Sequence, residues 1–269
     1  MKIIQGIFNF LKFRVETKPI PFGFYHLISL LVIILACVFI CKKYYNASQK
    51  KVEKLILIMW AIMFVFEVYK QLMYSISIKD GKFVWDYQWY IFPFQFCSTP
   101  LYIMPLALLI KNQKVKDALY SFLAFFSLFG GAIVLAYPQQ VFSTSILGVL
   151  LQTMVHHGIM VATSILLIVH YKDKLNIKFY FSGLVVFTST LLIAQILNDT
   201  FIYLTDELFN MFYISRHFKS TLVILSDIYY LIPYPLVFAL YFIGFSLIAY
   251  LFYLISKCII KIKKGCKES

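Results

Sequence analysis

Long apolar stretches alternate with short polar ones along this chain. Residues 19–41 and 87–110 contain no Asp, Glu, Lys or Arg, and residues 55–78 contain only Glu67 and Lys70. Residues 118–171 are also free of these charges, and at ~1.5 Å rise per residue they are too long for one crossing of ~30 Å of hydrocarbon. The pattern therefore predicts a series of membrane-spanning helices.

The pattern predicts an all-α polytopic membrane protein with seven transmembrane helices in a single bundle. Pro138, Gln139 and Gln140 supply the turn that divides the longest stretch into two spans. We expect an amphipathic N-terminal segment at 1–18, the transmembrane domain at 19–256 and a basic tail at 257–269. The expected spans are 19–41, 55–78, 87–110, 118–137, 145–170, 179–198 and 228–256.

Composition agrees with a membrane location. The 269 residues are 61% hydrophobic and only 14% charged, and the mean hydropathy is +0.81. A soluble domain carries about 25% charged residues, so a soluble globular enzyme is excluded. The five cysteines are dispersed and do not form the framework of a disulfide-rich domain.

The net charge of +13 is informative about the orientation of the chain in the membrane and does not by itself indicate a binding partner. The basic residues lie in short connections between apolar stretches, so they do not indicate nucleic-acid binding. Sixteen of the 25 lysines and arginines fall on one side of a seven-span arrangement. Because basic residues favour the cytoplasmic side, we expect a multi-pass cell-membrane protein with its N-terminus outside and its C-terminus in the cytoplasm.

Polar side chains inside the predicted spans are the informative ones, because an ionisable group in hydrocarbon is costly and faces a cavity or a partner. With the expected orientation, all of them can reach one cavity in the outer leaflet. They are Glu67 in the second span, Gln95 and Cys97 in the third, His156 and His157 in the fifth, and Asn198, Asp199 and Thr200 at the end of the sixth.

A cysteine beside a histidine suggests thioester chemistry. An imidazole can take the thiol proton, and the thiolate can attack an ester carbonyl. Glu67 or Asn198 is available to orient the imidazole, and Gln95 or Asn198 to stabilise an oxyanion. Three structural readings stay open: Cys97 as a small packing residue, the histidines as hydrogen-bonding groups between helices, and Glu67 as a protonated buried carboxyl.

Five short motifs resemble the YwaF-type integral membrane proteins of bacteria, which share a fold with a eukaryotic transmembrane phospholipid acyltransferase. Their order and spacing agree with that family over nearly the whole chain. The motifs are FEVYKQLMY at 66–74, FPFQFCSTPLYIMPLAL at 92–108, VHHGIMV at 155–161, LNDTFIYL at 197–204 and IPYPLVF at 232–238.

This resemblance implies Cys97 as the nucleophile and His157 as the base, because His157 is followed by Gly158 as in the family's His-Gly motif. Two positions depart from the family pattern. Gln95 stands where the family has a histidine, and Thr200 stands where it has an asparagine. The resemblance implies the fold more firmly than the reaction.

The leading hypothesis is an integral membrane acyltransferase or lipid hydrolase that acts on membrane lipids through a Cys-His pair in an intramembrane cavity. The alternative is a transporter or proton-coupled binding protein that uses the same cavity, with Glu67 and His157 as a proton relay. A non-catalytic membrane component is a third possibility. No nucleotide-binding or zinc-protease motif is present in the sequence, so no cofactor or metal is expected.

Overall fold

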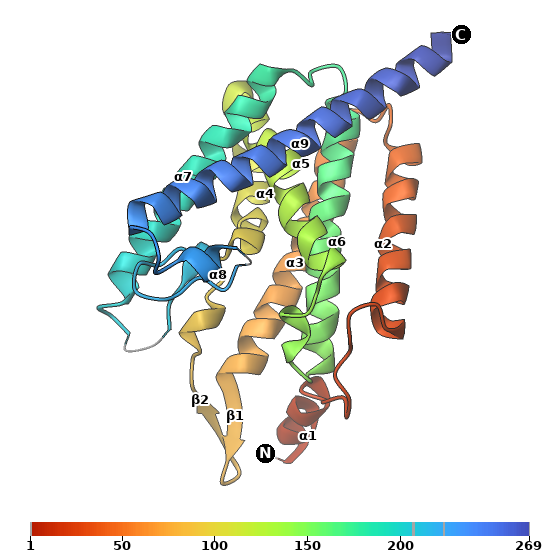
Figure 1. Cartoon of the computed structure of the whole chain (residues 1–269). Helices are drawn as coiled ribbons and strands as arrows, with labels where there is room; N and C mark the ends of the chain where they lie inside the picture. Colours follow the sequence, from red (N-terminus) through yellow and green to blue (C-terminus); the bar gives the residue numbers. More distant parts are fainter. Residues whose placement is uncertain (1, 206–207, 223, 269) are drawn as a thin grey trace.

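The computed structural model describes residues 2–205, 208–222 and 224–268, with side chains to residue 263. Helices dominate it, and one short β-hairpin interrupts them (Figure 1). The elements are α1 (Lys2–Leu11), α2 (Phe24–Lys43), α3 (Gln49–Ser75), β1 (Ile76–Lys79), β2 (Lys82–Trp85), η1 (Trp89–Ile91), η2 (Phe96–Ser98), α4 (Pro100–Leu109), α5 (Gln113–Ala136), η3 (Val141–Ser143), α6 (Leu147–His170), α7 (Ile177–Phe201), η4 (Met211–Tyr213), α8 (Leu225–Ile228) and α9 (Tyr234–Glu268).

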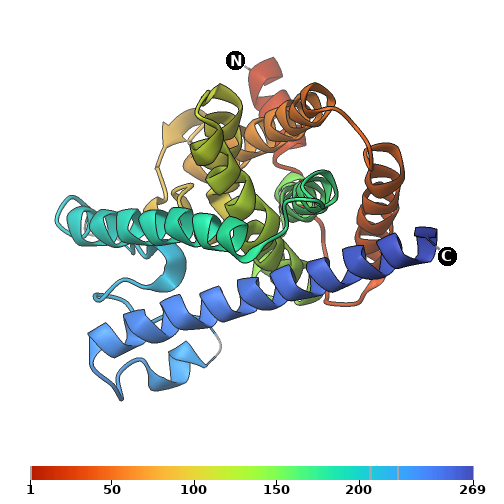
Figure 2. The same cartoon turned by 90° about the horizontal axis from the view of Figure 1, so that it is seen from above.

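Helix α5 is the centre of the bundle. It packs against α4, α6, α7 and α9, while α3 and α2 pack on α6. Seen from above, α6 is viewed close to its axis, whereas α7 and α9 cross the bundle at a strong tilt (Figure 2). A helix of the length of α9 spans ~50 Å, so its tilt lets a stretch longer than the hydrocarbon thickness fit a bilayer.

Aromatic rings fill the space around α5. Phe126 of α5 stacks on Phe187 of α7 with ring centroids 4.9 Å apart, and Phe129 meets Phe245 of α9 edge-on at 5.0 Å. Phe96 of η2 packs against Phe245 at 5.1 Å. The high aromatic content of the chain therefore forms the contact between the tilted helices and the short η2 segment.

Within the described residues, five helices are long and apolar enough to cross a membrane, namely α2, α5, α6, α7 and α9. Only 17% of the most apolar window is buried in α2 and in α9, which suits helices at the lipid boundary. The prediction of a helical membrane protein is confirmed. Helix α3 carries Glu67 and Lys70 in its interior and α4 has only ten residues, and neither is among the five.

The segment 87–110, expected as one continuous span, is a broken one. Two short 3-10 turns, η1 and η2, precede α4, and the backbone of Gln95 is extended between them. Proline explains part of this, because Pro93 keeps Phe92 out of the helical region, and both Pro93 and Pro100 lack a backbone donor. Cys97 therefore lies in a turn before a short helix and not within a regular third span.

The hairpin and α1 form a cap at the end of the molecule opposite the C-terminus (Figure 1). Asp80 and Gly81 both have positive φ, as the tight turn of a two-residue hairpin requires. Phe8 of α1 packs edge-on against Phe83 with ring centroids 5.5 Å apart. The expected span 55–78 thus ends in a strand, because the chain leaves α3 after Ser75 to make this hairpin.

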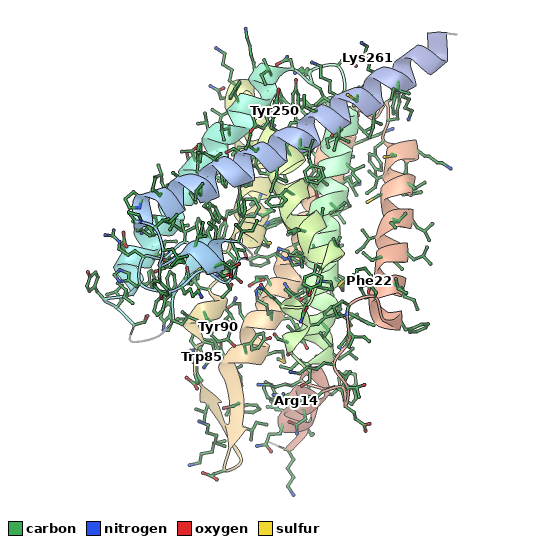
Figure 3. The ribbon with its side chains drawn as sticks, in the orientation of Figure 1. Arg14, Phe22, Trp85, Tyr90, Tyr250 and Lys261 are labelled. Carbon is green, nitrogen blue, oxygen red and sulfur yellow. The ribbon has the colours of Figure 1, made fainter. Side chains whose placement is uncertain are left out.

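Several hydrophobic side chains of α1 stay exposed in the structure. Phe8 is buried, whereas Ile3, Ile4, Ile7 and Phe10 are more than half exposed. Helix α1 lies at the same end of the molecule as Arg14 and Trp85, and Lys261 of α9 lies at the opposite end (Figure 3). An exposed apolar helix face at one end of a membrane bundle suits the expected position of 1–18 in the membrane interface.

The C-terminal boundary differs from the expected one. Helix α9 begins at Tyr234, and the expected seventh span began at 228, where the short helix α8 ends instead. The helix continues without interruption to Glu268, so within the described residues no break in secondary structure follows residue 256. Lysine has a favourable helix propensity, so the lysines after residue 256 continue α9 beyond its apolar part.

Candidate functional site

Cys97 lies at the break before α4 and against α5. Its thiol points at the backbone carbonyl of Gly130, with Sγ and the oxygen 3.8 Å apart. A Cβ at Gly130 would meet the Phe96 ring at 2.9 Å, and one at Gly131 would meet the His157 carbonyl at the same distance. The two glycines therefore allow α5 to approach both η2 and α6 at this point.

His156 is the imidazole in contact with the Cys97 residue. Its Nε2 lies 2.8 Å from the Cys97 carbonyl oxygen, and the ring is buried. A carbonyl only accepts, so Nε2 carries the proton and the lone pair of the ring is on Nδ1. Among the described residues, Nδ1 has no hydrogen-bond partner. The site thus contains a neutral imidazole whose basic nitrogen is buried and free.

His157, the base implied by the resemblance, has a different contact. Its Nδ1 lies 2.7 Å from the Thr153 carbonyl of its own helix, and its ring centroid is 5.4 Å from that of His156. Consecutive helical residues point about 100° apart, so the two rings face different neighbours. The structure places His156, and not His157, in hydrogen-bonding contact with the Cys97 segment.

Glu67 forms an ion pair within α3 and accepts a hydrogen bond from α6. Its Oε1 is 2.8 Å from Nζ of Lys70 and accepts a hydrogen bond of 2.7 Å from Gln71, and its Oε2 accepts one of 3.4 Å from Gln152. The Glu67 side chain is 6% exposed and that of Lys70 is 18% exposed. Such a buried pair is compatible with a bilayer because each charge is matched.

Gln152 connects this pair to the cysteine. It lies one turn before His156 on the same face of α6. Gln152 bonds Glu67 of α3 and His156 bonds the Cys97 carbonyl, so these two hydrogen bonds lie one turn apart along α6. We call these residues, with Lys70 and Gln71, the Cys97 cluster.

Sequence reasoning did not include Lys70 or Gln71 among the site residues. Both could have been found from the sequence, because the residues three and four positions after Glu67 lie on the same face of a helix.

Gln95 and Asn198 hold a different segment. The Gln95 amide donates to the Asn210 carbonyl at 2.9 Å and accepts from the Phe212 amide at 2.8 Å. Asn198 donates to the Met211 carbonyl at 3.0 Å and accepts from the Met211 amide at 2.6 Å. Each amide thus uses its oxygen and one of its two N–H groups on the backbone of 210–212, which orients both side chains toward that connection.

The α7–α8 connection folds back into the bundle because of these two amides. Met211 and Phe212 are fully buried, and Phe212 packs against Phe96 with ring centroids 5.6 Å apart. Tyr213 follows in the same connection. Burial raises the pKa of Tyr213. The connection therefore packs against the segment that contains Cys97, through Gln95 and Phe96.

The other two residues of the expected corner point elsewhere. Asp199 makes a two-pronged pair with Arg216, whose Nε is 2.9 Å from Oδ1, and this pairing raises the pKa of Arg216. Thr200 is exposed, and its hydroxyl bonds the Ile196 carbonyl of its own helix. The polar residues expected around one cavity thus form two hydrogen-bonded groups. One is the Cys97 cluster. The other, which we call the 210–212 clamp, consists of Gln95, Asn198 and the backbone of 210–212, and residues 95–97 connect the two groups.

Metal binding finds no support in the part of the chain that the structure describes. No group of three or more His, Cys, Asp or Glu side chains there is arranged to hold an ion. The polar side chains of the Cys97 cluster are two amides, one ion pair and one imidazole, and the free nitrogen of that imidazole is a group that can accept a proton.

Comparison with known protein families gives one match. The model of the TMEM164 family matches residues 21–255, which include all five membrane helices over most of their length and both polar groups described above. No curated protein and no solved structure matches the chain significantly. Because the matched region is most of the chain, the protein belongs to the TMEM164 family.

Proposed function

We propose that this TMEM164-family protein is a membrane-embedded acyltransferase or lipid hydrolase that transfers acyl groups through a thioester on Cys97. The observation that carries the proposal is the contact between His156 and the Cys97 residue, which leaves a buried basic nitrogen next to a thiol-bearing turn. The kinship to YwaF-type proteins and to the eukaryotic phospholipid acyltransferase, suggested by the sequence motifs, is part of the same proposal.

The proposed reaction has two balanced steps. First, the Cys97 side chain turns from the Gly130 carbonyl, which its thiol contacts at 3.8 Å, toward Nδ1 of His156. The thiol then gives its proton to Nδ1, and the sulfur attacks the ester carbonyl carbon of a lipid. The ester C–O bond breaks, and the departing alcohol takes the proton from the imidazole. In the second step an acceptor alcohol, or water, attacks the thioester, transfers its proton to the imidazole, and releases the thiolate, which takes that proton back.

Surrounding residues have positioning roles in this proposal. The hydrogen bond from Gln152 to Glu67 holds α3 against α6 and fixes the face of α6 that carries His156, and Lys70 balances the charge of Glu67 within α3. In this proposal the 210–212 clamp, which packs on the neighbouring Gln95 and Phe96, keeps water from Cys97 and so favours transfer to an alcohol over hydrolysis. Membrane phospholipids are the proposed substrate class because the site lies within the apolar bundle.

The first test is direct capture of the acyl group. We expect the purified protein, incubated with a phospholipid that carries a labelled acyl chain, to acquire that chain at Cys97, detected by peptide mass spectrometry and removed by neutral hydroxylamine. Cys97→Ala should abolish the adduct. Cys41→Ala is the matched control, since Cys41 also lies in an apolar segment but has no histidine contact among the described residues. Undiminished acyl transfer by Cys97→Ala would exclude the thioester.

A second candidate function is proton-coupled transport. The broken segment before α4 and the buried Glu67–Lys70 pair favour it, since discontinuous helices and intramembrane charges mark many transport paths. Transport predicts that function survives Cys97→Ala and is lost in Glu67→Gln. Acyl transfer predicts that Cys97→Ala is inactive and that Glu67→Gln retains partial activity.

We further propose that α3 and the η2–α4 segment complete seven crossings, with the N-terminus outside and the C-terminus in the cytoplasm. The termini lie at opposite ends of the structure, as an odd number of crossings requires (Figure 1). We expect a reporter fused after Ser269 to be active in the cytoplasm, and a cysteine introduced at Lys2 to react with an impermeant thiol reagent from outside. The reverse result would invert the leaflet assigned to the Cys97 cluster.

A further inference from the structure

A basic pocket lies where α2 passes into α3, away from the Cys97 cluster. It has a volume of about 490 Å³. Its walls come from the last turn of α2, the connection, and the first three turns of α3. The lining residues are Lys42, Lys43, Tyr44, Tyr45, Asn46, Ala47, Lys51, Lys54, Leu55 and Ile58. We call it the α2–α3 pocket.

Four lysines give this pocket a concentrated positive charge. Lys42 and Lys43 end α2, and Lys51 and Lys54 lie near the start of α3. None of the four has an ion pair with an acidic side chain in the described ranges. The acidic residue between them in sequence, Glu53, is occupied by Lys116 at 2.8 Å. The charge of the pocket is therefore uncompensated from within the described chain.

The connection that forms the pocket is held in place. Lys172 donates hydrogen bonds to the Tyr45 carbonyl at 2.6 Å and to the Asn46 side chain at 3.1 Å. Lys172 and Lys263 also lie over the Tyr45 ring, 4.2 and 4.1 Å from its centroid. These contacts tie the connection to the α6–α7 turn and to α9, and they bring two more cations close to the pocket. The pocket is thus a preformed site for an anion.

One wall of the pocket is apolar and faces the lipid side of α3. Leu55 and Ile58 belong to the lining, and Ile58 is 48% exposed on a surface that continues over Leu57 and Ile62. A small soluble anion would gain nothing from this wall. A ligand with a phosphate and an acyl chain would use both the lysines and the apolar surface, which is the combination that basic pockets between membrane helices offer to lipid headgroups.

We propose that the α2–α3 pocket binds an anionic phospholipid, with the headgroup phosphate between the lysines of α2 and α3 and an acyl chain along Leu55 and Ile58. The site is separate from the Cys97 cluster and does not depend on its chemistry. Bound lipid would stabilise the junction of α2 and α3, and the protein would therefore prefer membranes that contain anionic lipid.

The test uses the full chain purified in a neutral detergent and titrated with phosphatidylglycerol or phosphatidylcholine. We expect phosphatidylglycerol to raise the Tm of the protein and to remain bound in native mass spectra, and phosphatidylcholine to do neither. Replacing all four pocket lysines with glutamine should weaken phosphatidylglycerol binding by about tenfold or more. Lys111→Gln in the α4–α5 connection, combined with Lys114→Gln in the first turn of α5, is the control and should leave binding unchanged.

Two further measurements make the result decisive. The Tm of the glutamine variant without lipid should equal that of the wild type, which separates loss of the site from loss of the fold. Inorganic phosphate is titrated as the soluble form of the same group. Equal stabilisation by phosphate and by phosphatidylglycerol would overturn the lipid assignment, and unchanged phosphatidylglycerol binding by the glutamine variant would overturn the site.

Discussion

His156→Gln is expected to lower acyl transfer by about 10²- to 10⁴-fold while the protein stays folded. Glutamine keeps a side-chain donor that can reach the Cys97 carbonyl, which His156 contacts at 2.8 Å in the wild type, but it has no basic nitrogen. The variant therefore removes the base and retains the hydrogen bond. The measurement is the initial rate of acyl transfer to Cys97, together with the Tm.

His157→Gln is the matched variant. His157 bonds the Thr153 carbonyl of its own helix, so its replacement is expected to change the rate by less than about tenfold. The opposite outcome, with His157→Gln inactive and His156→Gln active, would restore the assignment that the resemblance implied. It would also mean that His156 serves only to hold the turn that contains Cys97.

Hydropathy predicted the membrane class because every long helix must cover its backbone polar groups and present apolar side chains to lipid. It could not predict the break at Gln95 to Pro100. A charge-free stretch has the same composition whether it forms one helix or two turns and a short helix, and only packing against Phe212 and Gly130 decides between them. Irregular backbone is tolerated here because protein covers it on both sides.

The sequence singled out the polar residues by their place in apolar stretches, but their grouping depends on contacts that the sequence does not contain. Asn198 and Gln95 are far apart in the chain and meet through 210–212, a segment that hydropathy assigns to a loop. A loop that returns to the core leaves no periodic signal. The choice between two adjacent histidines likewise depends on the rotation of α6, which Gly131 and the Glu67–Gln152 contact set.

Lys70→Met is expected to destabilise the protein by about 3–5 kcal/mol, because it leaves the Glu67 carboxylate buried without its counter-charge. The double variant Glu67→Gln with Lys70→Met removes both charges and keeps an amide that Gln71 and Gln152 can bond. We expect it to recover most of the lost stability. The measurement is unfolding in detergent, compared across the two single variants and the double variant as a cycle.

The control for this prediction is the exposed pair of Lys174 and Asp117, whose nitrogen and oxygen are 3.8 Å apart and whose lysine side chain is 61% exposed. Lys174→Met should cost less than about 1 kcal/mol, since water screens that pair. If Lys70→Met proves as mild as Lys174→Met, the prediction is wrong and the Glu67–Lys70 ion pair is not a source of stability for the fold.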